Sequence, residues 1–451
     1  MRVATYNRHL CFRIKVYMDS FKKSKYVVVE EVQDKIFLYY SSLSNEFMLL
    51  NSTKSSTIQN NSADEIESKD PELFNILLDK KFILEEDFNE TGTITRKRRE
   101  SIESKDWYQI VVNTTLDCNL NCWYCYENKV KGSRLTREAI EAICSNILAQ
   151  FSHSPYKALK LSFFGGEPFM YWKGMREIIE FADSFCKDNN VTLILDFTTN
   201  ATLMNERIID YLSKYQCHFQ ITLDGSEVTH NLVKKPLSGN SNSYRKTLSA
   251  LKLITEKINK HLIALRINFD NRALNEIDSI INDISFLNRK RSYVIVKKVW
   301  QIDTEDVDKG SLLQVLQKLF DNRFLPDYYI MPKGDVCFAE RENQVLFNYD
   351  GNIFKCTTIC SFDKDNSLGE LNTDTGLVRW NEPILSEWLG DMQQQQCLEC
   401  KWYGACFGPC NRQLMANRDT FICTFDSMNL DTKEYLMYLF KYNLLMNELY
   451  S

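Results

Sequence analysis

Apolar positions between about residues 108 and 301 follow two different periods. Short runs rich in β-branched and aromatic residues alternate with longer segments whose apolar residues recur at helical spacing. This alternation is typical of a parallel sheet with helices packed on it, and six strand-and-helix units fit an α/β fold, a partial (β/α)6 TIM-like barrel. The predicted strands are residues 108–115, 159–164, 191–199, 218–224, 262–269 and 293–299, and the predicted helices are 136–151, 173–187, 205–214, 244–257 and 274–287.

The chain before the barrel has a different pattern. Strand-like stretches at 27–32 and 35–40 come first, then a polar stretch, then a helical stretch at 72–84. They predict a small α+β module that is joined to the barrel by a charged linker at 89–106. The basic cluster Arg96 to Arg99 in this linker is flanked by acidic residues, so we expect it to be solvated.

The chain after the barrel becomes rich in cysteine. Beyond Leu325 the alternation of strands and helices stops and few long elements are expected. We therefore expect metal ligation to replace a conventional core there, with an amphipathic helix at about 428–449 closing the chain. The expected domains are residues 1–100, 104–325, 331–427 and 428–451.

Composition narrows the class of protein. The 451 residues include 55 Lys and Arg against 60 Asp and Glu, a net charge of -5, so nucleic acid is not expected as a partner. No apolar run reaches about 18 residues, and the charged N-terminus lacks the apolar core of a signal peptide, so no membrane is expected either. We therefore expect a cytoplasmic protein, in which the 15 Cys would rarely form disulfides.

Unusual residues follow the first four predicted strands. In barrels of this kind the reactive groups lie on loops at the C-terminal ends of the strands. These ends therefore mark the expected active site. The residues are Cys118, Cys122 and Cys125 after the first strand, Gly165 to Pro168 after the second, Thr199 and Asn200 after the third, and Asp224 and Gly225 after the fourth.

Cys118, Cys122 and Cys125 form a C-x3-C-x2-C motif on one loop. Three thiolates are one short of the four that saturate a tetrahedral zinc ion or a four-iron cluster, so the motif indicates a metal centre with an open position. The alternative is a zinc knuckle completed by a distant histidine. The chain has five His, and none is close to the motif in sequence.

With this motif the chain resembles the radical S-adenosylmethionine (SAM) superfamily. The resemblance implies that the three cysteines hold a [4Fe-4S] cluster whose fourth iron is chelated by SAM, and that Tyr124 lies against the adenine. Gly165, Gly166, Glu167 and Pro168 match the family's Gly-Gly-Glu-Pro element. The glycines would let the backbone approach the ligand closely, and Glu167 would accept a hydrogen bond from the methionyl ammonium.

Other parts of the resemblance are looser. Thr199 and Asn200 match a Thr-Asn element of the family, and Thr222 with Asp224 and Gly225 matches its Ser-x-Asp-Gly element. Thr222 would then lie near the ribose or the methionyl carboxylate. Arg245 is a candidate partner of that carboxylate by position. Arg266 and Asn268 are expected to point into the barrel, where they bind a ligand or satisfy each other.

The C-terminal cysteines resemble the SPASM domain, an extension of radical SAM enzymes that carries two auxiliary iron-sulfur clusters. The resemblance implies an outer and an inner [4Fe-4S] cluster, which makes three clusters in all. The fourth ligand of the inner cluster is either Cys360 or, if that position is open, a side chain of the substrate. For the whole region the alternative is a pair of zinc ribbons. The implied outer ligands are Cys397, Cys400, Cys406 and Cys423, the inner ligands are Cys337, Cys356 and Cys410, and the remaining Cys11, Cys144, Cys186 and Cys217 are expected to be small buried hydrophobes.

Together these features resemble maturases of ribosomally synthesised peptides (RiPPs). Such an enzyme would use a 5'-deoxyadenosyl radical, generated with an electron from a flavodoxin or ferredoxin, to install a thioether or carbon-carbon cross-link in a precursor peptide. Residues 1–100 would be a winged-helix-like recognition module that binds the leader as an added strand, or else a structural cap. Two alternatives stay open: a sulfatase-type maturase, against which Thr357 counts because an Asp base is expected there, and a non-enzymatic metal-bound scaffold that binds a peptide.

Overall fold

The computed structural model describes residues 20–299, 308–329, 335–359 and 361–451. It divides into two compact units, which are described separately. The first runs to Thr93 and includes Glu399–Gly404, and the second comprises Ile94–Leu398 and Ala405–Ser451. The predicted domain boundaries at residues 100, 104, 325, 331 and 427 stay a prediction. Cys11 and Cys360 lie outside the described residues.

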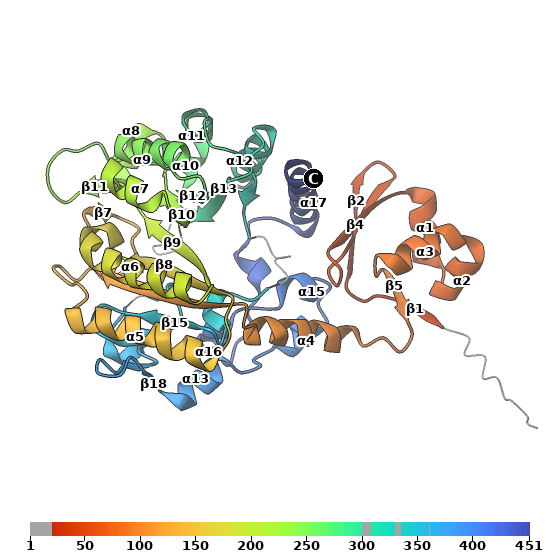
Figure 1. Cartoon of the computed structure of the whole chain (residues 1–451). Coiled ribbons are helices and arrows are strands. Elements are labelled where there is room, and N and C mark those ends of the chain that lie inside the picture. The colour runs from red at the N-terminus through yellow and green to blue at the C-terminus, as the bar shows by residue number, and fades with distance from the viewer. Residues whose placement is uncertain (1–19, 300–307, 330–334, 360) are drawn as a thin grey trace, which may run out of the picture. The chain divides into compact units, whose positions relative to one another are not determined.

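A sheet of 11 strands forms the centre of the second unit in the described part of the chain (Figure 1). Its strand order is β14-β13-β12-β10-β9-β8-β6-β15-β16-β17-β18, parallel from β14 to β15 and antiparallel from β15 to β18. The strands are β6 Trp107–Thr115, β8 Ala158–Gly165, β9 Thr192–Thr199, β10 Gln216–Thr222, β12 His261–Phe269, β13 Ser292–Lys298, β14 Pro326–Asp327, β15 Gln344–Phe347, β16 Asn352–Phe354, β17 Gly369–Leu371 and β18 Val378–Trp380.

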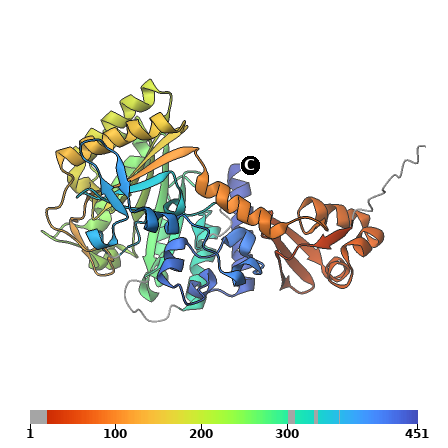
Figure 2. The same cartoon turned by 90° about the horizontal axis from the view of Figure 1, so that it is seen from below.

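Helices that connect the parallel strands cover the outer face of this sheet (Figures 1 and 2). Their apolar stripes drive this packing: in α6, Ile178, Ile179 and Ala182 are fully buried. The helices are α5 Arg137–His153, α6 Trp172–Asp188, α7 Glu206–Leu212, α8 Glu227–Val233, α9 Ser243–Lys257, α10 Asn271–Asn275, α11 Ile277–Asp283 and α12 Lys309–Asp321, with the 3-10 turn η1 Pro168–Tyr171.

The predicted α/β fold is confirmed. All six predicted strands are present with ends shifted by at most two residues, and they lie next to one another in the parallel part of the sheet. The predicted helix at 274–287 is divided into α10 and α11. A short antiparallel ladder between β7 (Leu120–Cys122) and β11 (Lys234–Pro236) was not predicted.

The predicted linker at 89–106 is instead helix α4, Glu90–Glu103, so this prediction is wrong. Ile94, Arg98 and Ile102 occupy one face at spacing four, and all three are buried with exposed fractions of 1%, 2% and 1%. The apolar stripe is interrupted by an arginine whose charge is paired inside the protein. The many charged residues of this segment therefore led to the wrong expectation that it is solvated, whereas one face of the helix is buried.

The cysteine-rich region also has an apolar core of its own, which corrects the expectation that metal ligation would replace one. Ala339, Leu368 and Trp388 pack together in one buried cluster, and Leu346 and Phe354 join another. The elements not yet named are η2 Phe338–Glu340, η3 Lys364–Asn366, α13 Glu382–Trp388, α14 Gln395–Leu398, α15 Tyr403–Cys406, α16 Asn411–Ala416, η4 Thr424–Ser427 and the closing helix α17 Thr432–Tyr450.

The first unit is a small α+β fold built on a three-stranded antiparallel sheet of order β2-β3-β4. Tyr39, Ile66 and Leu77 form part of its core. The stretch described from the sequence only as polar holds β4, α1 and α2, and a capping box between Ser62 and Glu65 begins α2. The elements are β1 Phe21–Lys23, β2 Val27–Gln33, β3 Ile36–Ser41, β4 Glu46–Asn51, α1 Ser52–Asn60, α2 Ala63–Lys69, α3 Pro71–Asp79 and β5 Ile83–Glu85.

Within the described residues, no helix has the length and apolar character needed to cross a membrane.

Candidate active site

A cavity of about 620 Å³ is lined by residues of the parallel strands, among them Thr199 and Thr222 at the C-terminal ends of β9 and β10. Its wall combines residues from β6, β8, β9, β10 and β12 with residues from the cysteine-rich region, namely Phe338, Thr357 and Thr358. Residues that the sequence singled out on or after five separate strands thus meet in one space. The predicted residues that line it are Cys118, Cys122, Tyr124, Cys125, Gly165, Gly166, Thr199, Asn200, Thr222, Arg266 and Asn268.

The loop with the three cysteines is closed by hydrogen bonds at its base. The hydroxyl of Thr115 at the end of β6 donates to the carbonyl of Ser133 over 2.6 Å, and the Ser133 hydroxyl accepts from the backbone N–H of Leu116 over 2.9 Å. Burial raises the pKa of the Cys118 thiol to about 12. The unliganded Cys118 thiol is therefore neutral at pH 7, and a bound metal would have to displace its proton.

The two glycines at the end of β8 contact this loop. The N–H of Gly166 donates to the carbonyl of Thr115 over 3.0 Å. A Cβ atom on Gly165 would lie 2.2 Å from the Thr115 carbonyl oxygen, and one on Gly166 would lie 2.1 Å from that of Asp117. Gly165 also has a φ of +111°. The structure therefore assigns the glycines a close approach to the cysteine loop, whereas the sequence suggested an approach to the ligand.

Glu167 is fully buried and fixes the end of β9. Its carboxylate accepts hydrogen bonds from the Thr199 hydroxyl over 2.7 Å, the Asn200 N–H over 2.8 Å and the Phe169 N–H over 3.1 Å. Burial raises the pKa of Glu167. It is not among the residues that line the cavity. Glu167 therefore positions Asn200, whose side-chain amide reaches Asn119 in the cysteine loop over 3.0 Å.

Tyr124 lies between Cys122 and Cys125 in the sequence, and its hydroxyl is hydrogen-bonded to the buried side chains of Asp224 and Asn268. Its hydroxyl donates to the Asp224 carboxylate and accepts from the Asn268 amide over 3.1 Å. Asp224 also accepts from the backbone N–H of Asn268 over 2.9 Å. Burial, and then the charge of Asp224, raise the pKa of Tyr124 well above its ordinary value. The tyrosine is thus a neutral, fixed side chain in the wall of the cavity.

Lys234 is a residue of this site that the sequence did not reveal. It is paired with Cys122 in the β7–β11 ladder and is 4% exposed. Its ammonium lies 3.9 Å from the Cys122 sulfur and 3.7 Å from the Asp224 carboxylate. Burial alone would lower the pKa of Lys234, but electrostatic interactions with Cys122, Tyr124 and Asp224 raise it well above its ordinary value. A permanent positive charge therefore lies beside a cysteine of the motif.

Comparisons with known proteins agree with this geometry. Residues 112–283 match the model of the radical SAM superfamily, and they include the cysteine loop and the strands that form most of the cavity wall. These residues form a radical SAM domain. The chain is 22% identical over 433 residues to TigE, a radical SAM cyclopropyl synthase of Paramaledivibacter caminithermalis. The aligned region covers 86% of this chain and 89% of TigE.

One further relative and one solved structure extend the similarity beyond the radical SAM domain. A cysteine-type anaerobic sulfatase-maturating enzyme of Clostridium perfringens is 22% identical over 331 residues, 65% of this chain and 86% of that enzyme. The solved structure of native anSMEcpe with bound AdoMet has a TM-score of 0.55 at 18% identity and covers 76% of this chain and 98% of that one. At this identity the structural similarity establishes the fold.

The donors of the radical SAM domain suit an iron-sulfur cluster with SAM. Cysteine thiolates are soft ligands of the kind that hold such clusters, and all three line one cavity. Asn200 and Lys234 place an N–H donor within 4.0 Å and 3.9 Å of the sulfurs of Cys118 and Cys122. In the described part of the chain, no three His, Cys, Asp or Glu side chains are spaced as the ligands of a single metal ion.

Replacing Lys234 by methionine is expected to lower the reduction potential of the cluster in the radical SAM domain. Hydrogen bonds and positive charge at the ligand sulfurs stabilise the reduced, more negative state of a cluster. We expect a shift of about 60 mV to more negative potential, which is a tenfold change for one electron. An EPR-monitored redox titration measures it. The neighbouring Lys235 is exposed, so Lys235→Met is the matched control, and equal potentials in the two variants would contradict the role of Lys234.

Arg245, predicted as a carboxylate partner, lies away from the cavity. Its side chain is 74% exposed and pairs with Glu227 over 2.9 Å on the surface. Arg266 does line the cavity, and its Nε donates to Asn268 over 2.8 Å. Glu127 also lines the cavity and was not predicted. Burial raises its pKa to about 8.

The three predicted inner cysteines of the C-terminal region lie near one another. Burial raises the pKa of Cys337 to about 12, and the nearby thiols of Cys356 and Cys410 raise it further. Of the predicted outer ligands, Cys406 lies with its sulfur 3.7 Å from the hydroxyl of Thr424, the residue after Cys423. Among the cysteines expected in the core, Cys186 and Cys217 are buried and Cys144 is half-buried.

Proposed function

We propose that this protein is a radical SAM maturase that modifies a ribosomally synthesised precursor peptide. One observation carries the proposal: the cavity that holds the cysteine motif is completed by Phe338, Thr357 and Thr358 of the cysteine-rich region. A reactive radical needs a space that excludes water and presents one C–H bond, and a barrel closed by a second segment provides it. Two similar proteins support this proposal: one relative is a cyclopropyl synthase, and one similar structure holds a bound peptide, Cp18Cys.

The residues of the site have distinct roles in this proposal. When bound, the [4Fe-4S] cluster supplies the electron that cleaves SAM into methionine and a 5'-deoxyadenosyl radical. Cys118, Cys122 and Cys125 would hold that cluster. We propose as SAM contacts those predicted residues that line the cavity or hold a lining residue in place. Arg245 is not among them, because its side chain is exposed and paired with Glu227. They are Tyr124, Gly165, Gly166, Asn200 and Thr222, with Glu167 supporting Asn200.

The cysteine-rich region would carry two auxiliary [4Fe-4S] clusters, which brings the total to three. Cys337, Cys356 and Cys410 are proposed for the inner cluster because Cys356 and Cys410 both interact electrostatically with Cys337. The outer cluster is proposed to use Cys397, Cys400, Cys406 and Cys423. A flavodoxin or ferredoxin in the cytoplasm would supply the electrons.

The first unit is proposed to bind the leader of the precursor. Strand β2 lies at one edge of the three-stranded sheet and, among the described residues, pairs with β3 on one side. An extended peptide can pair with such an edge through backbone hydrogen bonds. The leader would then be held by its backbone and selected by the side chains beside the edge strand.

The reaction removes two hydrogens from the peptide. The radical takes one hydrogen atom and becomes 5'-deoxyadenosine. Formation of the new bond in the peptide would release one further electron, for which an auxiliary cluster would be the acceptor, and one proton, which a base would accept. With reductant, SAM and its precursor peptide, the reconstituted enzyme is expected to yield 5'-deoxyadenosine and a peptide two mass units lighter for each new bond. Cofactor cleavage with an unchanged peptide mass would overturn the proposal.

Fragmentation of the product separates two kinds of bond. A thioether or carbon-carbon cross-link between residues suppresses fragment ions from the bonds it encloses. A cyclopropane within one residue, as the name of the TigE relative suggests, leaves the fragment series intact with the mass loss on that residue.

A sulfatase-type activity is the second candidate, because the Clostridium perfringens sulfatase-maturating enzyme is among the relatives. The position where a carboxylate base would be expected holds Thr357, which lines the cavity and whose carbonyl accepts a hydrogen bond from the Tyr126 hydroxyl over 3.1 Å. A neutral hydroxyl is a poor base at neutral pH. A cysteine-containing sulfatase peptide in the same assay distinguishes the two candidates.

A further inference from the structure

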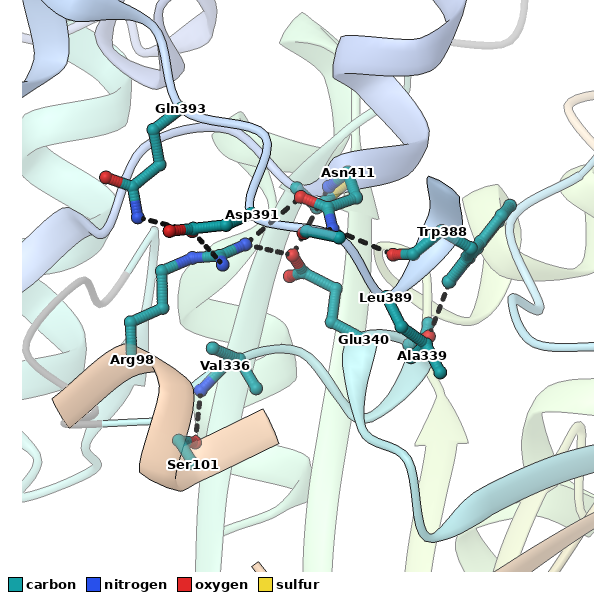
Figure 3. A network of polar contacts seen from close by, with 12 residues as sticks. Arg98, Ser101, Val336, Ala339, Glu340, Trp388, Leu389, Asp391, Gln393 and Asn411 are labelled. Carbon is teal, nitrogen blue, oxygen red and sulfur yellow. Dashed lines mark hydrogen bonds and ion pairs between the residues drawn. The ribbon is translucent and has the colours of Figure 1, made fainter. Parts of the chain in front are cut away.

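A buried ion pair lies beside the predicted inner-cluster cysteines, outside the radical site. Arg98 of α4 donates through Nη2 to the Glu340 carboxylate over 2.7 Å, and the two side chains are 2% and 8% exposed (Figure 3). The same nitrogen donates to the side-chain oxygen of Asn411 over 3.1 Å, and Nη1 lies 3.5 Å from Asp391. All these residues belong to the second unit.

The partners of Arg98 are close in sequence to two cysteines. Glu340 ends the 3-10 turn that Cys337 begins, and its N–H donates to the Cys337 carbonyl over 2.9 Å. Asn411 follows Cys410, the residue that caps α16. The backbone N–H of Asn411 also donates to the Glu340 carboxylate over 3.3 Å. Arg98 and Glu340 thus join the two cysteine-bearing segments to each other.

Further hydrogen bonds make this junction rigid. The Asn411 amide donates to the carbonyls of Trp388 and Gly390 over 2.7 and 2.8 Å, and the Trp388 indole donates to the Ala339 carbonyl over 2.7 Å (Figure 3). One turn further along α4, the Ser101 hydroxyl accepts from the N–H of Val336, the residue before Cys337, over 3.0 Å. Helix α4 therefore contacts the chain on both sides of Cys337.

The third inner cysteine is fixed in the same neighbourhood. Lys355, the residue before Cys356, is 1% exposed, and its ammonium donates to the carbonyls of Arg341 and Gln344 over 2.6 and 2.8 Å. Arg341 directly follows the turn that ends at Glu340, and Gln344 begins β15 three residues later. All three cysteine-bearing segments are consequently attached to the same short stretch of chain.

We propose that Arg98 is a positioning residue for the inner auxiliary cluster: through Glu340 and Asn411 it holds Cys337 and Cys410 so that their thiols face one cluster. This inference rests on the proposed function, in which these cysteines carry iron. A buried ion pair is weak evidence for a stabilising role by itself, whereas its use in fixing a specific arrangement is well attested. The attachment of both partners to cysteine-bearing segments is what favours positioning here.

The test counts iron and acid-labile sulfide after anaerobic reconstitution of the full chain. The wild type is expected to hold about twelve irons, three four-iron clusters. Arg98→Met is expected to lose about four of them and the EPR signal of one auxiliary cluster, while it still forms 5'-deoxyadenosine from SAM. Arg96→Met is the matched control on the same helix, because Arg96 is 69% exposed and only approaches Glu100 at 3.7 Å. It should keep all the iron.

A second variant separates positioning from simple stability. Arg98→Met leaves the Glu340 charge buried without its partner, so the double variant Arg98→Met with Glu340→Gln removes that charge while the amide can still accept from Asn411. We expect the double variant to melt close to the wild type and still lack about four irons. A well-folded double variant with the full iron count would overturn the role of Arg98. A wild type that itself lacks auxiliary clusters would instead overturn the three-cluster proposal, and with it this inference.

Discussion

Replacing Cys122 by alanine is expected to abolish formation of 5'-deoxyadenosine and to remove about four irons from the reconstituted protein. The motif provides three thiolates for a cluster that already has one open position, and all three line a single cavity. Loss of one leaves two protein ligands, and no other cysteine among those that line the cavity can replace it. The measurements are chromatography of the SAM cleavage products and an iron count.

The matched control is Cys144→Ala on α5. Cys144 is half-buried, and it is not among the residues that line the active-site cavity. Its loss should cost about 1 kcal/mol of stability and leave cofactor cleavage unchanged. Undiminished cleavage in the Cys122 variant would show that the motif does not hold the catalytic cluster.

Replacing Gly165 by alanine is expected to prevent assembly of the same cluster. The left-handed φ of +111° alone costs about 1–2 kcal/mol for a residue with a Cβ. The new Cβ would also lie 2.2 Å from the Thr115 carbonyl, which is backbone and cannot rotate away. The cysteine loop or the end of β8 must therefore move. We expect a loss of stability of roughly 3 kcal/mol or more, measured by thermal unfolding, together with a low iron content.

Gly132 provides the comparison. It has a φ of +75°, and an added Cβ would meet no heavy atom within 4 Å. Gly132→Ala should therefore cost about 1 kcal/mol, and the cluster should still assemble. Equal effects of the two substitutions would mean that the close approach of Gly165 to Thr115 has no importance for the loop.

The strands and the cysteine motif could be predicted because they depend on local signals. Apolar runs of strand length predict the six parallel strands. Reactive groups are expected at the C-terminal ends of such strands, and Cys118, Asn200 and Thr222, chosen on that basis, do line one cavity. The order of elements along the chain was sufficient for this. No long-range side-chain contact had to be known.

The polar interior could not be predicted in the same way. Lys234 and Arg98 are charged residues in polar stretches, which usually indicate a solvated surface. Their burial depends on partners that are distant in sequence, Cys122 and Asp224 for the lysine and Glu340 for the arginine. Ion pairs of this kind leave no periodic pattern, so the linker prediction failed for α4 and the contribution of β11 to the site was missed.

The most direct test of the proposed function follows a hydrogen atom from the peptide to the cofactor. The reconstituted enzyme is given unlabelled SAM, reductant and a precursor peptide that carries deuterium on its carbon atoms, and 5'-deoxyadenosine is analysed by mass spectrometry. If this protein is a radical SAM peptide maturase, the nucleoside gains one deuterium while the peptide is modified. A modified peptide accompanied by 5'-deoxyadenosine without deuterium would contradict the proposal.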